Sequence, residues 1–84
     1  MANDISTPLR GKISAVSSCG RFGVVTLDAP EDGHNYAVIN DETKGRVALL
    51  SSTKKGVLQQ DTRVVIQEAE RGSEAFRALQ VVRA

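Results

Sequence analysis

The chain has few of the residues that usually carry catalysis or metal binding. Its 84 residues include no tryptophan, one tyrosine, two phenylalanines, one histidine and one cysteine. A single cysteine, Cys19, excludes an internal disulfide, and one cysteine with one histidine is too few for a zinc site of the usual ligand count. We therefore expect neither a metal nor another cofactor.

Long hydrophobic runs and a strong excess of one charge are also lacking. No apolar run approaches the roughly 20 residues needed to cross a bilayer. Residues 1–10 are polar and do not contain the apolar segment of a secretory signal, so we expect a cytoplasmic protein without membrane attachment. Eleven basic residues against ten acidic ones leave a net charge of +1, so any binding of nucleic acid must come from local patches.

The candidates for acid, base or nucleophile do not form a catalytic set. His34 lies in a turn segment, where a lone histidine beside Asp32 is far more often solvated than catalytic. The neighbouring cation of Arg21 could lower the pKa of Cys19, but no partner residue is available, so a small turn residue is the better interpretation. The carboxylate pairs at 31–32 and 41–42 lie in turn-forming segments. We expect no enzymatic activity.

The pattern of apolar residues predicts an all-β domain. Residues 1–8 read as a flexible tail, and residues 9–84 as one domain. The β-rich runs alternate with turn formers, among which Asp32-Gly33 is a strong hairpin signal. Five short strands with frequent turns favour a small barrel. The expected strands are residues 13–16, 22–27, 36–40, 63–68 and 75–83.

Residues 46–53 admit two interpretations. The apolar run 46–50 follows a turn at 41–45, which indicates a third strand that is extended and folded into a hairpin. Alternatively, residues 46–53 form a short helical turn, at the position where oligonucleotide-binding barrels often carry one. Residues 51–60 then form a loop, with Lys54 and Lys55 near its tip.

Phe22 stands between two glycines in the segment Gly20-Arg21-Phe22-Gly23. Glycines allow the backbone to bulge or to approach a ligand closely, so a flat ring could stand beside a cation on the surface. The alternative is that Phe22 belongs to the core and that the glycines only turn the chain. The segment also fits the bare GxxG clamp of another RNA-binding fold, but that clamp joins helices and this one joins strands.

Two stretches of the chain resemble a known family. Residues 11–17 read GKISAVS and residues 20–25 read GRFGVV. They resemble the opening of a cold-shock domain and align with it without a gap. The usual pattern of that family is Gly-Lys-Val-Lys-Trp-Phe-Asn, a turn, then Lys-Gly-Phe/Tyr-Gly-Phe-Ile. More loosely, residues 30–33 resemble the acidic glycine turn of that family, and residues 58–66 resemble its Leu-x-x-Gly-x-x-Val-x-Phe strand. The resemblance spans about residues 9–83.

The resemblance implies a five-stranded antiparallel OB-fold barrel that binds single-stranded RNA or DNA. Members stack successive bases on aromatic side chains inside a cationic groove. Phe22 matches the first aromatic of the central motif, but Val24 replaces the second. Ala15 and Val16 replace the aromatic pair of the first strand. The histidine and aromatics of the family's second motif, Val-Phe-Val-His-Phe, have no counterpart in residues 37–50.

The resemblance therefore implies weak, salt-sensitive binding of single-stranded nucleic acid and a role in regulating gene expression, including transcription. Fold alone does not establish function. The residues that could take part are cations and rings on the first hairpin, at the start of the third strand and in the following loops. They are Lys12, Arg21, Phe22, His34, Tyr36, Lys44, Arg46, Lys54 and Lys55.

A protein-interaction module is the alternative. A barrel face that has lost its aromatics could serve as an aliphatic docking surface, formed by Ala15, Val16 and Val24. A weakly charged apolar patch suits a protein partner or self-association better than it suits phosphates. Substituting these positions discriminates between the two functions.

Overall fold

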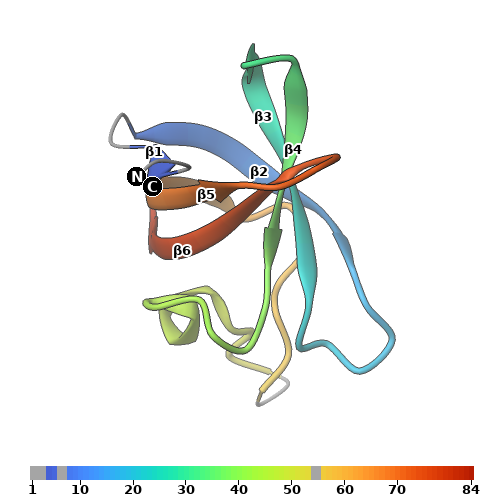
Figure 1. Ribbon diagram of the computed structural model, residues 1–84. Coiled ribbons are helices and arrows are strands. Elements are labelled where there is room, and N and C mark those ends of the chain that lie inside the picture. Colours follow the sequence, from blue (N-terminus) through green and yellow to red (C-terminus); the bar gives the residue numbers. More distant parts are fainter. Residues whose placement is uncertain (1–3, 6–7, 54–55) are drawn as a thin grey trace.

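The computed structural model describes residues 4–5, 8–53 and 56–84 (Figure 1). They form six strands and one short 3₁₀ helix. In chain order these are β1 (Asp4–Ile5), β2 (Leu9–Val16), β3 (Gly23–Glu31), β4 (His34–Ile39), η1 (Arg46–Leu49), β5 (Arg63–Arg71) and β6 (Phe76–Arg83).

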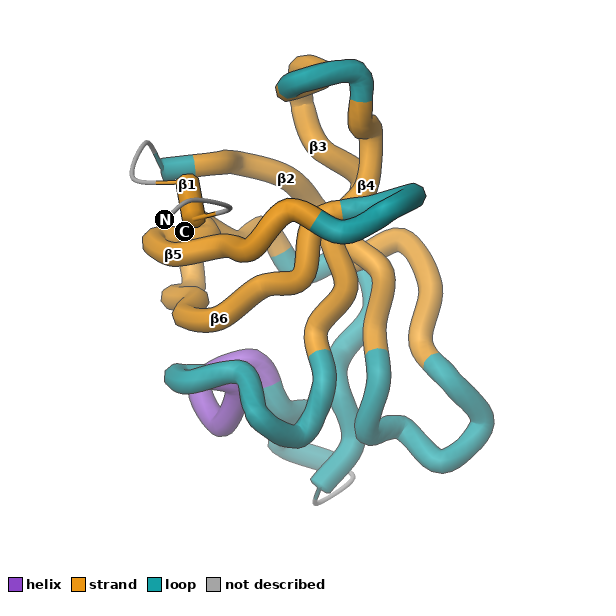
Figure 2. The backbone as a smooth tube through the Cα atoms, in the orientation of Figure 1, coloured by secondary structure: helices purple, strands orange, loops and turns teal. Residues whose placement is uncertain are grey.

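Five of these strands close into a barrel (Figure 2). The strand order is β5-β2-β3-β4-β6, and β6 pairs with β5 to complete the circle. The predicted five-stranded barrel is therefore confirmed. The expectation of an entirely antiparallel sheet is wrong for one pair, because β4 and β6 run parallel. These two strands are joined by a crossover through η1 and β5 and not by a hairpin, which permits the parallel direction.

The hairpin between β3 and β4 turns where the sequence predicts. Glu31 pairs with His34, so Asp32 and Gly33 form a two-residue loop. Both have positive φ, 52° and 80°, which is the requirement of a type I′ turn. Glycine adopts this conformation without strain and aspartate tolerates it, so these two residues determine where the strand reverses.

Residues 46–49 form η1, so the hairpin interpretation of this segment is wrong and the helical-turn alternative is correct. The helix begins after Gly45, which has a φ of 84°, a left-handed conformation that strands do not contain. Leu49 is fully buried and is part of the barrel core. Arg83 of β6 donates hydrogen bonds from Nε and a terminal nitrogen to the Ala48 carbonyl, at 3.1 and 2.8 Å. A helical turn can bury Leu49 while the two preceding residues, Val47 and Ala48, both stay exposed. In a strand, adjacent side chains point to opposite faces, so Val47 and Ala48 would not both face solvent.

The core is almost entirely aliphatic. Inward-facing residues alternate with outward-facing ones along the strands, as in Leu9, Gly11 and Ile13 of β2. Of the phenylalanine and tyrosine rings, only that of Phe76 is buried. The buried apolar residues form one cluster: Leu9, Ile13, Val25, Leu27, Ala37, Ile39, Leu49, Leu58, Val64, Ile66, Ala69, Phe76, Ala78 and Val81.

Part of the segment expected to be a tail pairs with the barrel. The two residues of β1 lie antiparallel to β5, with Asp4 opposite Glu70 and Ile5 opposite Ala69. This pairing adds one short strand to β5, beyond the residues 63–66 that pair with β2. No helix in the described part of the chain has the length and apolar character needed to span a membrane.

Candidate functional site

The outward-facing side chains of β2, β3 and β4 form a continuous surface, called here the outer face. Strand pairing aligns them in two rows. In the first row Ala15 lies opposite Val24, and Val24 lies opposite Val38. In the second row Lys12 lies opposite Thr26, and Thr26 lies opposite Tyr36. The first row is apolar and the second is polar, so the outer face has an apolar half and a polar half.

Phe22 lies at the edge of this surface and not in the core. It precedes the buried Gly23, and its side chain is 42% exposed. Because residues alternate along a strand, Phe22 shares the outward side of Val24 and Thr26. The alternative that Phe22 is a core residue is therefore wrong: the inward positions nearby are filled by Val25 and by other aliphatic side chains.

The loop of residues 17–22 holds Phe22 in place. The Ser17 amide donates to the Phe22 carbonyl at 2.9 Å, and the Phe22 amide donates to the Ser17 hydroxyl at 3.2 Å. At the tip, Gly20 has a φ of 78° and packs against Val57, and its carbonyl accepts a bond from the Leu58 amide at 2.8 Å. The loop is thus tied to the rest of the domain, and the ring is held at the end of the apolar half.

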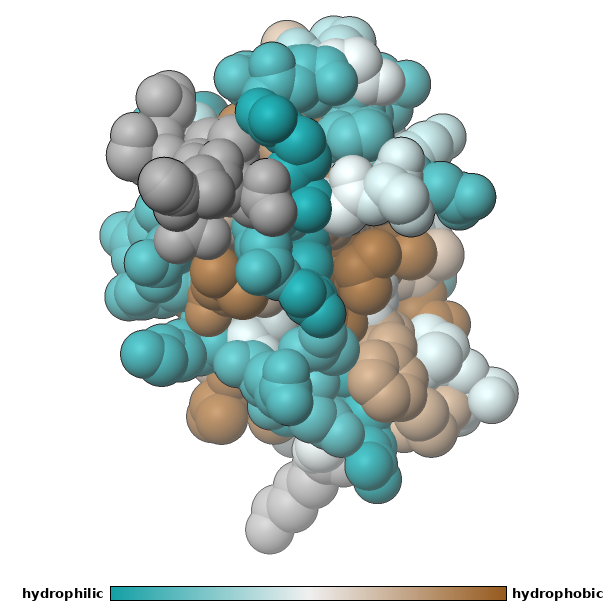
Figure 3. Space-filling view, viewed as in Figure 1, coloured by the Kyte–Doolittle hydropathy of each residue, from teal (hydrophilic) through white to brown (hydrophobic). Residues whose placement is uncertain are grey.

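Apolar side chains line a hollow of about 260 Å³ beside Phe22. Val38 also borders a second hollow, of about 450 Å³, which is formed with residues 72–77. Val38 therefore borders both hollows, one beside the loop 17–22 and one beside the turn 72–75. The space-filling view shows apolar side chains, in brown, lying open among polar ones (Figure 3). The lining residues of the first hollow are Ala15, Val16, Ser17, Phe22, Gly23, Val24 and Val38.

Tyr36 is the second exposed ring of the outer face. Its side chain is 48% exposed in the polar row, opposite Thr26. Beside it, the Thr26 hydroxyl donates to the Ser14 hydroxyl at 2.8 Å. Lys12 lies at the far end of the same row, where its ammonium is 4.0 Å from the Asp61 carboxylate. The structure therefore brings Lys12 and Tyr36 onto the same surface as Phe22.

Two further predicted cations, Arg21 and Arg46, lie together at Asp41. A terminal nitrogen of Arg21 is 3.1 Å from Asp41 Oδ2, and a terminal nitrogen of Arg46 is 3.6 Å from Asp41 Oδ1. Arg46 Nε donates to the Arg21 carbonyl at 3.4 Å. Two guanidiniums thus share one carboxylate, which leaves one excess positive charge in this cluster.

The other predicted residues have different surroundings. His34 is half-buried, and its ring packs edge-on against buried Phe76 with 5.2 Å between the centroids. The backbone of Lys44 bonds to β6 through the Leu79 carbonyl and the Val81 amide, each at 2.9 Å. His34 thus has a packing role, and Lys44 lies beside β6, away from the outer-face rows. Lys54 and Lys55 lie outside the described residues.

Cys19 is exposed at the tip of the 17–22 loop. Its sulfur lies 3.2 Å from the Ser17 hydroxyl. The hydrogen bond from Ser17 is the main cause that lowers the pKa of the Cys19 thiol, and the backbone N–H of Arg21 adds to it. In the described part of the chain, no three His, Cys, Asp or Glu residues gather into a group that could hold a metal ion.

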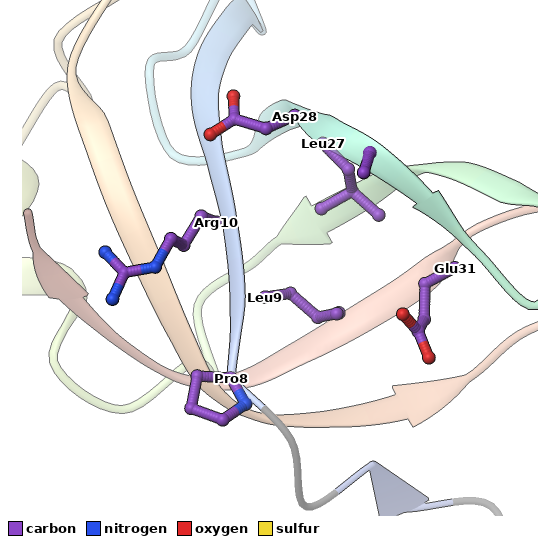
Figure 4. A pocket seen from close by; sticks show the side chains of 7 residues that line it. Pro8, Leu9, Arg10, Leu27, Asp28 and Glu31 are labelled. Carbon is purple, nitrogen blue, oxygen red and sulfur yellow. The ribbon is translucent and has the colours of Figure 1, made fainter.

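A third hollow, of about 220 Å³, lies between the start of β2 and the end of β3. Figure 4 shows the side chains of Leu9, Leu27 and Glu31 around the same space, whereas Arg10 and Asp28 point away from it. Asp28 instead forms an ion pair with Arg63. Because polar groups do not converge in this hollow, it offers little to orient a ligand.

Sequence reasoning missed two residues of the site. Val38 completes the apolar row, and the alternation of Tyr36, Val38 and the inward Ala37 and Ile39 could have revealed it. For Asp41 the sequence predicts only a solvated carboxylate in a turn. Its contacts with Arg21 and Arg46 span 20 and 5 positions in the chain, so no local pattern could have revealed both.

Comparison of the chain with family models, with curated proteins and with solved structures found no match. Its function therefore has to be inferred from the chemistry of the outer face.

Proposed function

We propose that this chain is an OB-fold, cold-shock-like protein that binds single-stranded RNA or DNA weakly on its outer face. In OB-folds the second and third barrel strands, with the loops between strands 1 and 2 and between strands 4 and 5, bind oligonucleotides. Here the corresponding elements are β3, β4, the loop 17–22 and the turn 72–75. The two hollows described above lie along these elements.

The exposure of Phe22 and Tyr36 on one surface is the observation that supports the proposal most strongly. A domain with so few aromatic rings would gain stability by burying them, yet these two are 42% and 48% exposed. Each base stacked on such a ring contributes about 1–3 kcal/mol. Two rings, Phe22 at the end of the loop 17–22 and Tyr36 on β4, therefore fit contact with two bases of an extended single strand.

The same stacking free energies predict weak binding. Two stacked bases contribute about 2–6 kcal/mol, less than the roughly 8 kcal/mol of a micromolar complex. Phosphate contacts must supply the difference, but Lys12, Arg21 and Arg46 each face a carboxylate. We expect a Kd of about 10–500 μM for a short oligonucleotide at low salt.

The proposal is tested by following backbone amide signals by NMR while a mixed-sequence single-stranded 12-mer is added. Shift changes confined to the strands of the outer face (β2, β3 and β4), the loop 17–22, the turn 72–75 and the segment 41–46 support it. Shift changes mainly in the rest of the barrel, or none at low salt, contradict it.

Protein docking is a second candidate function, which the apolar lining of the first hollow favours. Ala15, Val16 and Val24, with Phe22 and Val38, form a patch that lacks charged side chains. Exposed apolar patches often mark contacts with other proteins or with a second copy of the chain. Sedimentation at increasing protein concentration detects self-association, and Val24→Asp should abolish it.

A further inference from the structure

The carboxylate of Asp41 lies between two guanidiniums and offers a different oxygen to each. Oδ2 is 3.1 Å from Arg21, and Oδ1 is 3.6 Å from Arg46. A phosphodiester group also presents two unbridged oxygens that bear one negative charge. It can therefore take the same place between the two arginines, since guanidinium groups bind carboxylate and phosphate in similar geometry.

The arginines differ in how firmly they are held. The Arg46 side chain is only 16% exposed, and its Nε bonds to the Arg21 carbonyl at 3.4 Å. The Arg21 side chain is 59% exposed, so it can follow an incoming anion. Arg46 is thus the more firmly held of the two, and the more exposed Arg21 directly precedes Phe22 in the chain.

The segment that carries Asp41 is anchored independently of this cluster. The Thr43 hydroxyl donates to the Ala78 carbonyl at 2.7 Å and accepts from the Asn40 amide at 3.0 Å. The Glu42 amide donates to Asn40 Oδ1 at 2.9 Å. The turn is therefore built by Asn40 and Thr43, and the Asp41 side chain, 45% exposed, is not needed to form it.

We propose that Arg21 and Arg46 form a phosphate subsite next to the Phe22 stacking platform, and that Asp41 occupies this subsite in the free protein and competes with the nucleic-acid backbone. This inference rests on the proposed function. It makes Asp41 an internal inhibitor of binding: a phosphate must displace the carboxylate before it can contact both guanidiniums.

Asp41→Asn tests the inference as a gain of function. Removing the negative charge that competes with the phosphate should raise the affinity for fluorescent (dT)12 about 3–10-fold at 50 mM salt. The plot of log affinity against log salt should become steeper by about 0.7, the value for one more neutralised phosphate on a single strand. Adding Arg21→Gln to Asp41→Asn should remove the gain.

Glu42→Gln is the matched control. It removes the same charge from the next position, and Glu42 forms no ion pair with a described residue. Its affinity for (dT)12 should stay within twofold of that of the unchanged chain. An equal gain in both variants, or no gain in Asp41→Asn, would overturn the inference and leave the proposed function intact.

Titration with inorganic pyrophosphate separates the two proposals. In Asp41→Asn the side-chain Nε–H signals of Arg21 and Arg46 should shift, and in Glu42→Gln they should shift less. If the arginine signals shift but (dT)12 binds to neither variant, the anion subsite exists and the nucleic-acid function is wrong. If neither probe affects these signals, the inference is wrong.

Discussion

Gly45 lies so close to Val81 that a β-carbon on it would be 2.1 Å from the Val81 carbonyl oxygen. The contact follows from a parallel bridge between Lys44 and Gln80, in which the Lys44 amide donates to the Leu79 carbonyl and the Val81 amide donates to the Lys44 carbonyl. This bridge fixes the chain just before η1 against β6. It thereby positions both the helix that covers the core and the segment that carries Asp41 and Arg46.

Gly45→Ala should therefore be strongly destabilising. The substitution adds a backbone clash to the strain of a φ of 84°, and we expect a loss of about 3 kcal/mol or more in the free energy of unfolding. Gly33→Ala is the control, because its φ is 80° but no atom lies within 4 Å of the added carbon. It should cost about 1–2 kcal/mol. Urea unfolding measures both, and equal losses would contradict the close contact.

Leu49→Ala tests whether η1 contributes to the core. Leu49 is fully buried, so its truncation should leave a cavity and cost about 2–5 kcal/mol. Val47, two positions earlier in the same helix, is 76% exposed, and Val47→Ala should change stability by less than about 0.5 kcal/mol. Thermal unfolding of the two variants gives the comparison. Similar melting temperatures would show that η1 does not cover the barrel.

The residues also explain which parts of the fold are predictable from the sequence. The Asp32-Gly33 pair predicts its turn, because few residues other than glycine, asparagine and aspartate adopt two adjacent positive φ angles. The apolar run 46–50 predicts a strand folded into a hairpin or a helical turn, because so few residues do not separate a period of 2 from a helical one. Its true conformation depends on contacts with β6, which lie more than 30 positions away.

The candidate site was predictable to a similar extent. The alternation along residues 22–26 indicates that Phe22, Val24 and Thr26 share one side, but not whether that side is inward or outward. The family resemblance supplied the outward interpretation of Phe22. The pairing of Arg21 and Arg46 with Asp41 depends on how the loop 17–22 folds against the segment after β4, which no local pattern encodes.

Ser17 should control the reactivity of Cys19. Because the Ser17 hydrogen bond is the main cause that lowers the Cys19 pKa, the thiolate is populated at a lower pH than in an ordinary thiol. The rate of alkylation by iodoacetamide should therefore rise at lower pH than for free cysteine. Ser17→Ala should raise the pKa and move this profile to higher pH, whereas Ser18→Ala should not. Identical profiles for all three proteins would contradict the assignment.

An aspartate at position 24 and one at position 25 should have opposite effects on folding. Val24 is half-buried and faces outward, so Val24→Asp should stay folded, whereas Val25 is fully buried and Val25→Asp should unfold the domain. Circular dichroism distinguishes the folded variant from the unfolded one. Unfolding of Val24→Asp would place the Val24 side chain in the core.

Val24→Phe should strengthen oligonucleotide binding, since it adds a ring to the apolar row of the folded domain.

Phe22→Ala should weaken binding of a single-stranded oligonucleotide about tenfold or more, because it removes one stacked base. Phe22→Tyr keeps the ring and should bind as well as the unchanged chain. Both variants should remain folded, since Phe22 is 42% exposed. Equal affinities of the alanine and tyrosine variants, measured by fluorescence anisotropy, would mean that the ring does not contact a base.

The central claim, that the outer face binds single-stranded nucleic acid, is tested most directly by a salt-dependent anisotropy titration. Labelled mixed-sequence single-stranded DNA and RNA are titrated with the pure protein at several salt concentrations between about 20 and 200 mM, a range that includes strong and weak screening. The account predicts saturable binding that weakens as salt increases and is lost with Phe22→Ala. An absence of binding at the lowest salt would contradict it and would leave protein docking as the function of this face.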